Sequence, residues 1–158
     1  MASATSGDQG RRQSGRCQVG ETGQDLLERI NRVRSEGRQC GDRFFEAAGP
    51  LSWSCKLEAA AHSHSTAMAQ QNFFGHIGPD GVKLGERVTR SGYNWSAVGE
   101  NIAAGQGSVD EVVTGWLSSP GHCTNIMKAA FTEMGAARVV EPGSQYSPLW
   151  TQVFGRPR

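Results

Sequence analysis

The chain has 158 residues, a length that favours one domain with its own hydrophobic core. With 16 basic and 15 acidic residues, its formal net charge of +1 gives no electrostatic footprint for nucleic acid or for an anionic membrane. No stretch approaches the roughly 20 apolar residues of a membrane-spanning helix, so we expect no membrane span.

The first 20 residues are rich in Gly, Ser, Gln and Arg and carry no apolar periodicity. We interpret residues 1–20 as a flexible N-terminal arm and residues 21–158 as a single domain. The start also lacks the apolar segment of a signal peptide. It is typical either of a cytosolic protein or of a mature secreted chain that has been given a new initiator Met.

The cysteines favour the secreted interpretation. There are four of them, widely and irregularly spaced, at Cys17, Cys40, Cys55 and Cys123. An even count without a C-x-x-C motif indicates two disulfides in an oxidising compartment and gives no support to a zinc ribbon. From these residues alone, three pairings remain open. We therefore expect a secreted or periplasmic protein.

Apolar spacing predicts two helices in the first half of the chain. The first is amphipathic and ends near Gly37, with Leu26, Leu27, Ile30 and Val33 on one face. The second follows a loop at Pro50 and is rich in alanine, which favours close packing against a neighbour. Its buried face is predicted to carry Leu57, Ala61, His64 and Met68.

A short helix is predicted over residues 83–90, with Leu84 and Val88 facing inward. Residues 95–104 are apolar and form either a strand or an extended loop. Ser108 and Glu111 match a capping box that begins another helix, whose core-facing residues include Trp116.

Ser119 and Pro120 are typical of the cap and first position of one more short helix, which carries His122 and Asn125. Two strands are predicted near the end, over residues 135–141 and 149–154. Helices come first and strands late, without a βαβ rhythm, so we predict an α+β fold with an antiparallel sheet.

Three residues stand out in separate turn-rich blocks: His76 in NFFGHIGPDG, Glu100 in VGENIAAG and His122 in GWLSSPGHCTNIM. Two imidazoles and a carboxylate flanked by glycine suit the rim of a cleft, where they would bind a divalent metal or transfer a proton. Their spacing matches no local metal motif. The structural alternative is that Glu100 and Asn101 cap a tight turn while His76 bonds within its loop.

These blocks, in this order, together with HSTAMA and LWTQVFG, resemble the CAP superfamily, whose SCP domain occurs in cysteine-rich secretory, antigen 5 and pathogenesis-related proteins. The match is closest to the bacterial branch and covers residues 24–157. The resemblance implies an α+β fold of a particular kind, a three-layer α-β-α sandwich with a central antiparallel sheet. It also implies a large cavity lined by two histidines and two glutamates.

By this resemblance, His76 and His122 are the two histidines and Glu100 is the first glutamate. The second glutamate should follow Trp116 by three residues, where this chain has Ser119. We place Ser119, Asn101 and Asn125 in the same cleft as Glu100. The resemblance also pairs Cys40 with Cys123 and Cys17 with Cys55.

We therefore expect a ligand-binding module in preference to an enzyme. The expected ligands are a divalent metal on His76 and His122, zinc above all, or a small lipid or sterol; no other cofactor is expected. An unknown protein partner stays open, and we expect a monomer. The alternative is a zinc-dependent, protease-like hydrolase in which His76 and His122 hold the metal and Glu100 is the general base.

Overall fold

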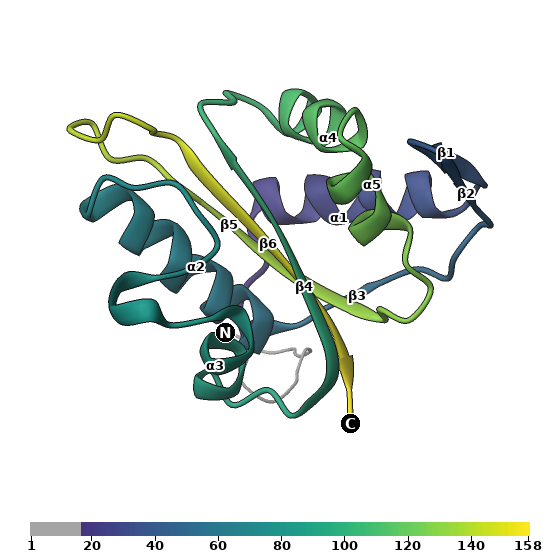
Figure 1. Cartoon of the computed structure of the whole chain (residues 1–158), viewed down its shortest axis with the longest axis horizontal. Helices are drawn as coiled ribbons and strands as arrows, with labels where there is room; N and C mark the ends of the chain where they lie inside the picture. The colour runs from purple at the N-terminus through teal and green to yellow at the C-terminus, as the bar shows by residue number, and fades with distance from the viewer. Residues whose placement is uncertain (1–16) are drawn as a thin grey trace, which may run out of the picture.

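A computed structural model describes residues 17–158 as three layers, with a twisted sheet between two groups of helices (Figure 1). The predicted N-terminal arm lies outside these residues except for its last part, residues 17–20. Helices α2 and α3 cover one face of the sheet, and α1, α4 and α5 cover the other. This arrangement is the α-β-α sandwich that the family resemblance implied, and its long strands are antiparallel as the sequence pattern predicted.

The sheet has the strand order β3-β5-β6-β4. Its three long strands are antiparallel neighbours: β4 (Trp95–Ala104), β5 (Glu133–Val139) and β6 (Leu149–Pro157). The two-residue strand β3 (Ser52–Trp53) adds to β5 in parallel, which the sequence pattern did not predict. A separate hairpin of β1 (Arg38–Cys40) and β2 (Arg43–Phe45) lies away from the sheet.

Helix α2 (Cys55–Gln70) lies very close to the sheet. Ser54 caps it by accepting a hydrogen bond from the backbone N–H of Leu57. A Cβ at Gly135 in β5 would lie 2.1 Å from the backbone nitrogen of Glu58, so only glycine permits this approach. The predicted inward face is buried, and Ser65 reaches Thr151 of β6 through a 2.7 Å hydrogen bond.

Two short elements follow α2 on the same face, the 3-10 helix η1 (Pro79–Gly81) and α3 (Leu84–Arg90). On the opposite face, α1 (Glu21–Arg34), α4 (Val109–Leu117) and α5 (Pro120–Met127) enclose the main core. Ser108 caps α4, but Glu111 accepts from Gly107 instead of from Ser108, so only half of the expected capping box forms.

Arg34 is buried at the end of α1, which the sequence did not indicate. Its guanidinium donates to four backbone carbonyls, those of Gly49, Ile126, Lys128 and Phe131. Burial lowers the pKa of Arg34 to about 10. The side chain therefore joins the end of α1 to the segment that follows α5.

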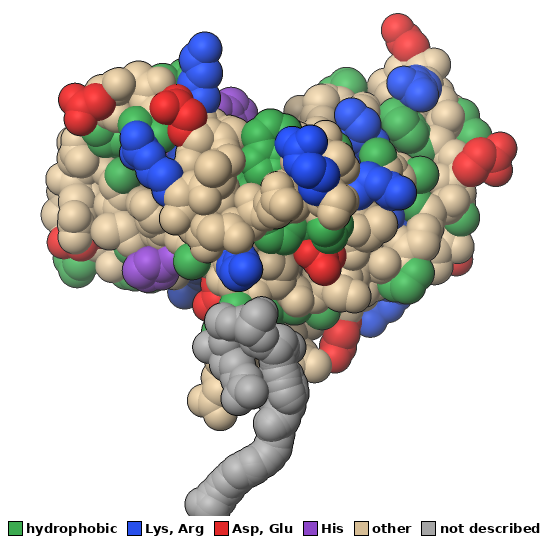
Figure 2. Space-filling model, turned by 90° about the horizontal axis from the view of Figure 1, so that it is seen from below, with side chains coloured by type: hydrophobic (Ala, Val, Ile, Leu, Met, Phe, Trp, Pro, Cys, Tyr) green, Lys and Arg blue, Asp and Glu red, His purple; other side chains and the backbone are tan. Residues whose placement is uncertain are grey.

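Both disulfides have the pairing that the family resemblance implied. Cys17 is bonded to Cys55 and Cys40 to Cys123, so α5 is tied to the β1–β2 hairpin. No helix within residues 17–158 is long and apolar enough to cross a membrane. On the face shown in Figure 2, basic side chains are spread out with acidic ones among them, as the balanced composition predicts.

Candidate functional site

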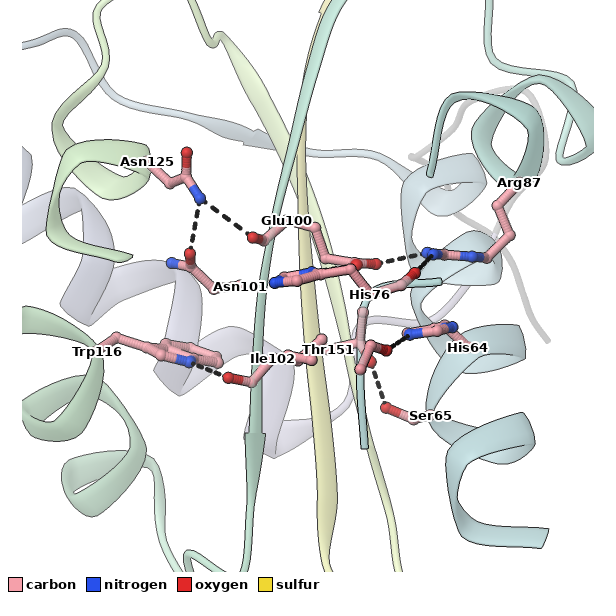
Figure 3. A network of polar contacts seen from close by, with 11 residues as sticks. His64, Ser65, His76, Arg87, Glu100, Asn101, Ile102, Trp116, Asn125 and Thr151 are labelled. Atoms are coloured by element: carbon pink, nitrogen blue, oxygen red, sulfur yellow. Dashed lines mark hydrogen bonds and ion pairs between the residues drawn. The ribbon is translucent and has the colours of Figure 1, made fainter. Parts of the chain in front are cut away.

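His76 and Glu100 come from different elements and meet at the surface of the sheet (Figure 3). His76 lies in the loop that leaves α2, and Glu100 lies in the middle of β4, opposite Val153 of β6. His76 Nδ1 lies 2.9 Å from Glu100 Oε1. The side chain of Glu100 is 2% exposed and that of His76 is 53% exposed, so a buried carboxylate orients an accessible imidazole.

Arg87 of α3 completes this arrangement, although the sequence pattern did not single it out. Its Nη1 donates to Glu100 Oε2 at 2.5 Å, and its Nη2 donates to the backbone carbonyl of His76 at 2.7 Å. One guanidinium therefore fixes both the carboxylate and the loop of the histidine. The sequence signal that could have identified Arg87 is its position on α3. It lies three residues after Leu84 and next to Val88, the two residues predicted to face inward.

The charge state of Glu100 follows from these contacts. Burial by itself raises the pKa of this carboxyl, but the hydrogen bond from His76 and the nearby charge of Arg87 outweigh burial and lower the pKa below its usual value. Glu100 is therefore ionised, and each of its oxygens already accepts a hydrogen bond. A carboxylate in this state is a weak proton acceptor.

His122 lies on α5, in the helical layer on the other face of the sheet from the loop of His76. Burial lowers the pKa of His122, and the nearby imidazole of His76 lowers it further. The backbone carbonyl of His122 accepts a hydrogen bond from Asn101 Nδ2 at 3.3 Å. Ser119 is the N-cap residue of α5, but its side chain forms no capping hydrogen bond.

The two asparagines predicted for the cleft join α5 to β4. Asn125 Nδ2 donates to the carbonyl of Glu100 at 3.1 Å and to Asn101 Oδ1 at 2.9 Å (Figure 3). Asn101 is fully buried and also donates to Gln152 Oε1 at 3.2 Å. These amides therefore set where α5, and with it His122, lies relative to Glu100.

A further histidine supports the loop of His76 from α2. His64 Nε2 lies 2.7 Å from the carbonyl oxygen of Gly75, which can only accept, so Nε2 carries the hydrogen. Burial lowers the pKa of His64 and favours the neutral ring. His64 was predicted on the packed face of α2, and it also anchors the residue before His76.

The donors in residues 17–158 do not form a complete metal cage, because no three His, Cys, Asp or Glu side chains there are grouped to hold an ion. The contact of His76 Nδ1 with Glu100 leaves Nε2 as the nitrogen for a ligand, an arrangement that is common for metal-binding histidines.

Comparison with known proteins gives consistent matches. The model of the CAP family, described as the cysteine-rich secretory protein family, matches residues 27–154. YkwD of Bacillus subtilis is 36% identical over 113 residues, which are 72% of this chain and 42% of YkwD. The match therefore covers less than half the length of this relative.

Solved structures show the same fold. An extracellular protein containing an SCP domain from Bacillus anthracis superposes with a TM-score of 0.70 and 30% identity, over 85% of this chain and 40% of that one. An outer surface protein of Borrelia burgdorferi gives a TM-score of 0.68 at 16% identity, over 85% and 89% of the two chains. Since the family model matches most of its residues, this chain belongs to the CAP, or cysteine-rich secretory protein, family.

Proposed function

We propose that this domain is secreted and binds a divalent metal, zinc in particular, between His76 and His122. The observation that carries the proposal is the contact of Glu100 with His76, because it directs the free Nε2 of an accessible imidazole away from the carboxylate. The two disulfides and the extracellular relative from Bacillus anthracis support secretion.

The metal chemistry expected from two histidines is modest. Neutral imidazole is a common zinc ligand, and the lowered pKa of His122 keeps its ring unprotonated near neutral pH. Bound zinc would polarise a ligand that completes its coordination. With two protein ligands the affinity should be well below that of a structural four-ligand site.

We do not favour the hydrolase alternative. A general base needs a free oxygen and a pKa near the working pH, whereas both oxygens of Glu100 accept hydrogen bonds and its pKa is lowered. In this proposal Glu100 positions His76 and keeps its ring in one tautomer.

A small hydrophobic ligand, such as a lipid or sterol, is a second candidate for the same place. Its support is the exposure of Phe74 and Ile77 on either side of His76, at 44% and 52%. The ring of Phe74 also lies 6.1 Å from that of Tyr146, so the rim beside His76 is apolar and aromatic. Such a rim suits an apolar ligand near a bound ion.

Calorimetric titration with zinc tests the main proposal. We expect wild type to bind one zinc ion, with binding lost in His76→Ala and His122→Ala and retained in His62→Ala, which removes an exposed histidine of α2. Glu100→Gln should weaken binding by about 10- to 100-fold, because it disturbs the orientation of His76. Zinc binding unchanged in both ligand variants would refute the proposal.

Two further measurements separate the alternatives. Peptide and ester hydrolysis that requires zinc and disappears in both His122→Ala and Glu100→Gln would support the hydrolase. Lipid or sterol uptake that requires Phe74 and Ile77 but survives His122→Ala and zinc removal would support the hydrophobic ligand without the metal.

A further inference from the structure

The two disulfides differ in how far they are open to the surface. Cys40 is 4% exposed and Cys123 is 0% exposed, whereas Cys17 and Cys55 are both half-buried. Cys17 and Cys55 also line a surface hollow of about 550 Å³, and Cys55 lines a second hollow of about 410 Å³. Neither Cys40 nor Cys123 lines either hollow. A small thiol can therefore approach the Cys17–Cys55 disulfide in the folded protein, but not the buried one.

Cys55 occupies a special position, because it is the first residue of α2. The first backbone N–H groups of a helix have no acceptor within the helix. Ser54 supplies acceptors for Leu57 and Glu58 through its hydroxyl and its carbonyl. The N–H groups of Cys55 and Lys56 have no acceptor within the described part of the chain. These N–H groups would stabilise a negative charge on the Cys55 sulfur, as the start of a helix does for reactive cysteines.

The charged side chains beside this sulfur favour the same state. Lys56 follows Cys55 directly and lines both hollows, and Arg158 adds a second cation to the smaller one. Each hollow also has one carboxylate side chain, Glu58 in the larger and Glu133 in the smaller. Each of these carboxylates accepts a hydrogen bond from an aromatic side chain. A Cys55 thiolate would therefore form next to a cation, at the positive end of a helix.

We propose that the Cys17–Cys55 disulfide is a thiol–disulfide exchange site whose co-reactant is a small thiol or dithiol. The thiolate of the co-reactant attacks Cys17 Sγ, the S–S bond breaks, and Cys55 leaves with the electron pair as a thiolate. A mixed disulfide then joins Cys17 to the co-reactant. We assign the attack to Cys17 because the better stabilised thiolate is the better leaving group.

A dithiol completes the reduction. Its second thiolate attacks its own sulfur in the mixed disulfide, so that the dithiol is released as a cyclic disulfide and Cys17 leaves as a thiolate, which takes a proton from water. Exchange frees Cys17 from the start of α2, while the Cys40–Cys123 disulfide continues to hold α5 at the β1–β2 hairpin. The exchange site is separate from the proposed zinc site, because neither His76 nor His122 lines either hollow.

Reduction of the native protein tests this proposal. Free thiols are blocked with iodoacetamide after increasing times in dithiothreitol, and the peptides are mapped by mass spectrometry. We expect Cys17–Cys55 to be reduced on the order of 100-fold faster than Cys40–Cys123, because attack on the buried pair requires local opening of the fold. In concentrated urea the two pairs should react at similar rates. Equal rates in the native protein would overturn the proposal.

Glutathione tests which sulfur leaves. The mixed disulfide should be found on Cys17 and the alkylated thiol on Cys55, and the opposite distribution would reject the assignment. Lys56→Gln should slow the reduction of Cys17–Cys55 about two- to threefold, as expected for the loss of one charge near the surface. Lys128→Gln, an exposed change that follows α5, should leave the rate unchanged. A faster reaction in Lys56→Gln would contradict the proposed leaving group.

Discussion

The two histidines of the site are held in different ways. His76 lies in a loop, yet its ring contacts Glu100, its carbonyl accepts from Arg87 and the residue before it is anchored by His64. His122 lies on a regular helix, but the contacts that fix it are made by its neighbours, Cys123 and Asn125, and by its own backbone carbonyl. The His76 side is organised by charge and the His122 side by covalent and amide links.

This difference indicates a division of tasks. The ring orientation and tautomer of His76 are specified, whereas for His122 it is the position of the helix that is specified. Substituting Arg87 should therefore disturb the orientation of the His76 ring. Removing the Cys40–Cys123 disulfide should instead change the distance between the two histidines. Substitutions on each side can test that contrast, and the largest effect is expected at Arg87.

Arg87→Met should lower the free energy of unfolding by about 3–5 kcal/mol, because it leaves the buried carboxylate of Glu100 without its cationic partner. Urea denaturation at neutral pH measures this. Arg90→Met, on the exposed part of the same helix, should change stability by less than about 0.5 kcal/mol. Arg87→Lys keeps the charge and should fall between them. Equal losses at both positions would show that Arg87 is not the organising contact.

Replacing Cys40 and Cys123 by alanine should lower the free energy of unfolding by about 2–5 kcal/mol, since the crosslink closes a loop with a sequence separation of 83. In the folded variant, NMR shifts should be larger for His122 than for His76. The matched pair is Cys17 and Cys55, with a separation of 38. Removing the Cys17–Cys55 disulfide should lower the free energy of unfolding by less and leave the NMR signals of both histidines unchanged. A larger loss of stability for this pair than for Cys40 and Cys123 would contradict the contrast.

Acidification should change the free energy of unfolding least of the three. We expect it to act on His64, which supports the loop of His76. Burial lowers the pKa of His64 in the folded state, so the unfolded chain binds more protons below the unfolded value of about 6.5. The contribution of neutral His64 to the free energy of unfolding is therefore present above that pH. It is lost on acidification, by at most about 1.4 kcal/mol per pH unit. Denaturation at pH 7.5 and 5.5 should show a smaller loss in His64→Gln than in His62→Gln.

Much of the fold could be predicted from the sequence. The helical faces around Leu57 and Trp116, the start of α5 at Ser119 and Pro120, and the late strands follow from local periodicity and capping. The segment at residues 95–104, which remained open between strand and loop, is β4. The disulfide pairing came from family resemblance alone, because spacing leaves all three pairings possible.

The rest depends on contacts between distant segments. Arg34 and Arg87 are residues of a type that usually lies on the surface. They can be buried here because folding brings backbone carbonyls to Arg34 and the carboxylate of Glu100 to Arg87. The parallel strand β3 is two residues long and has no periodicity to detect. For the site, the sequence selected His76, Glu100 and His122. The position of Arg87 beside Val88 indicated that it faces inward, but not that it donates to the second oxygen of Glu100.

The place of β6 in the sheet has a consequence for how the protein is made. It is the last strand along the chain, yet it lies between β5 and β4 and supplies hydrogen bonds to both. A nascent chain therefore cannot close the sheet until residues 149–157 have emerged, although all four cysteines have appeared by then. The sheet should therefore remain open until β6 has paired with both of its neighbours, β4 and β5.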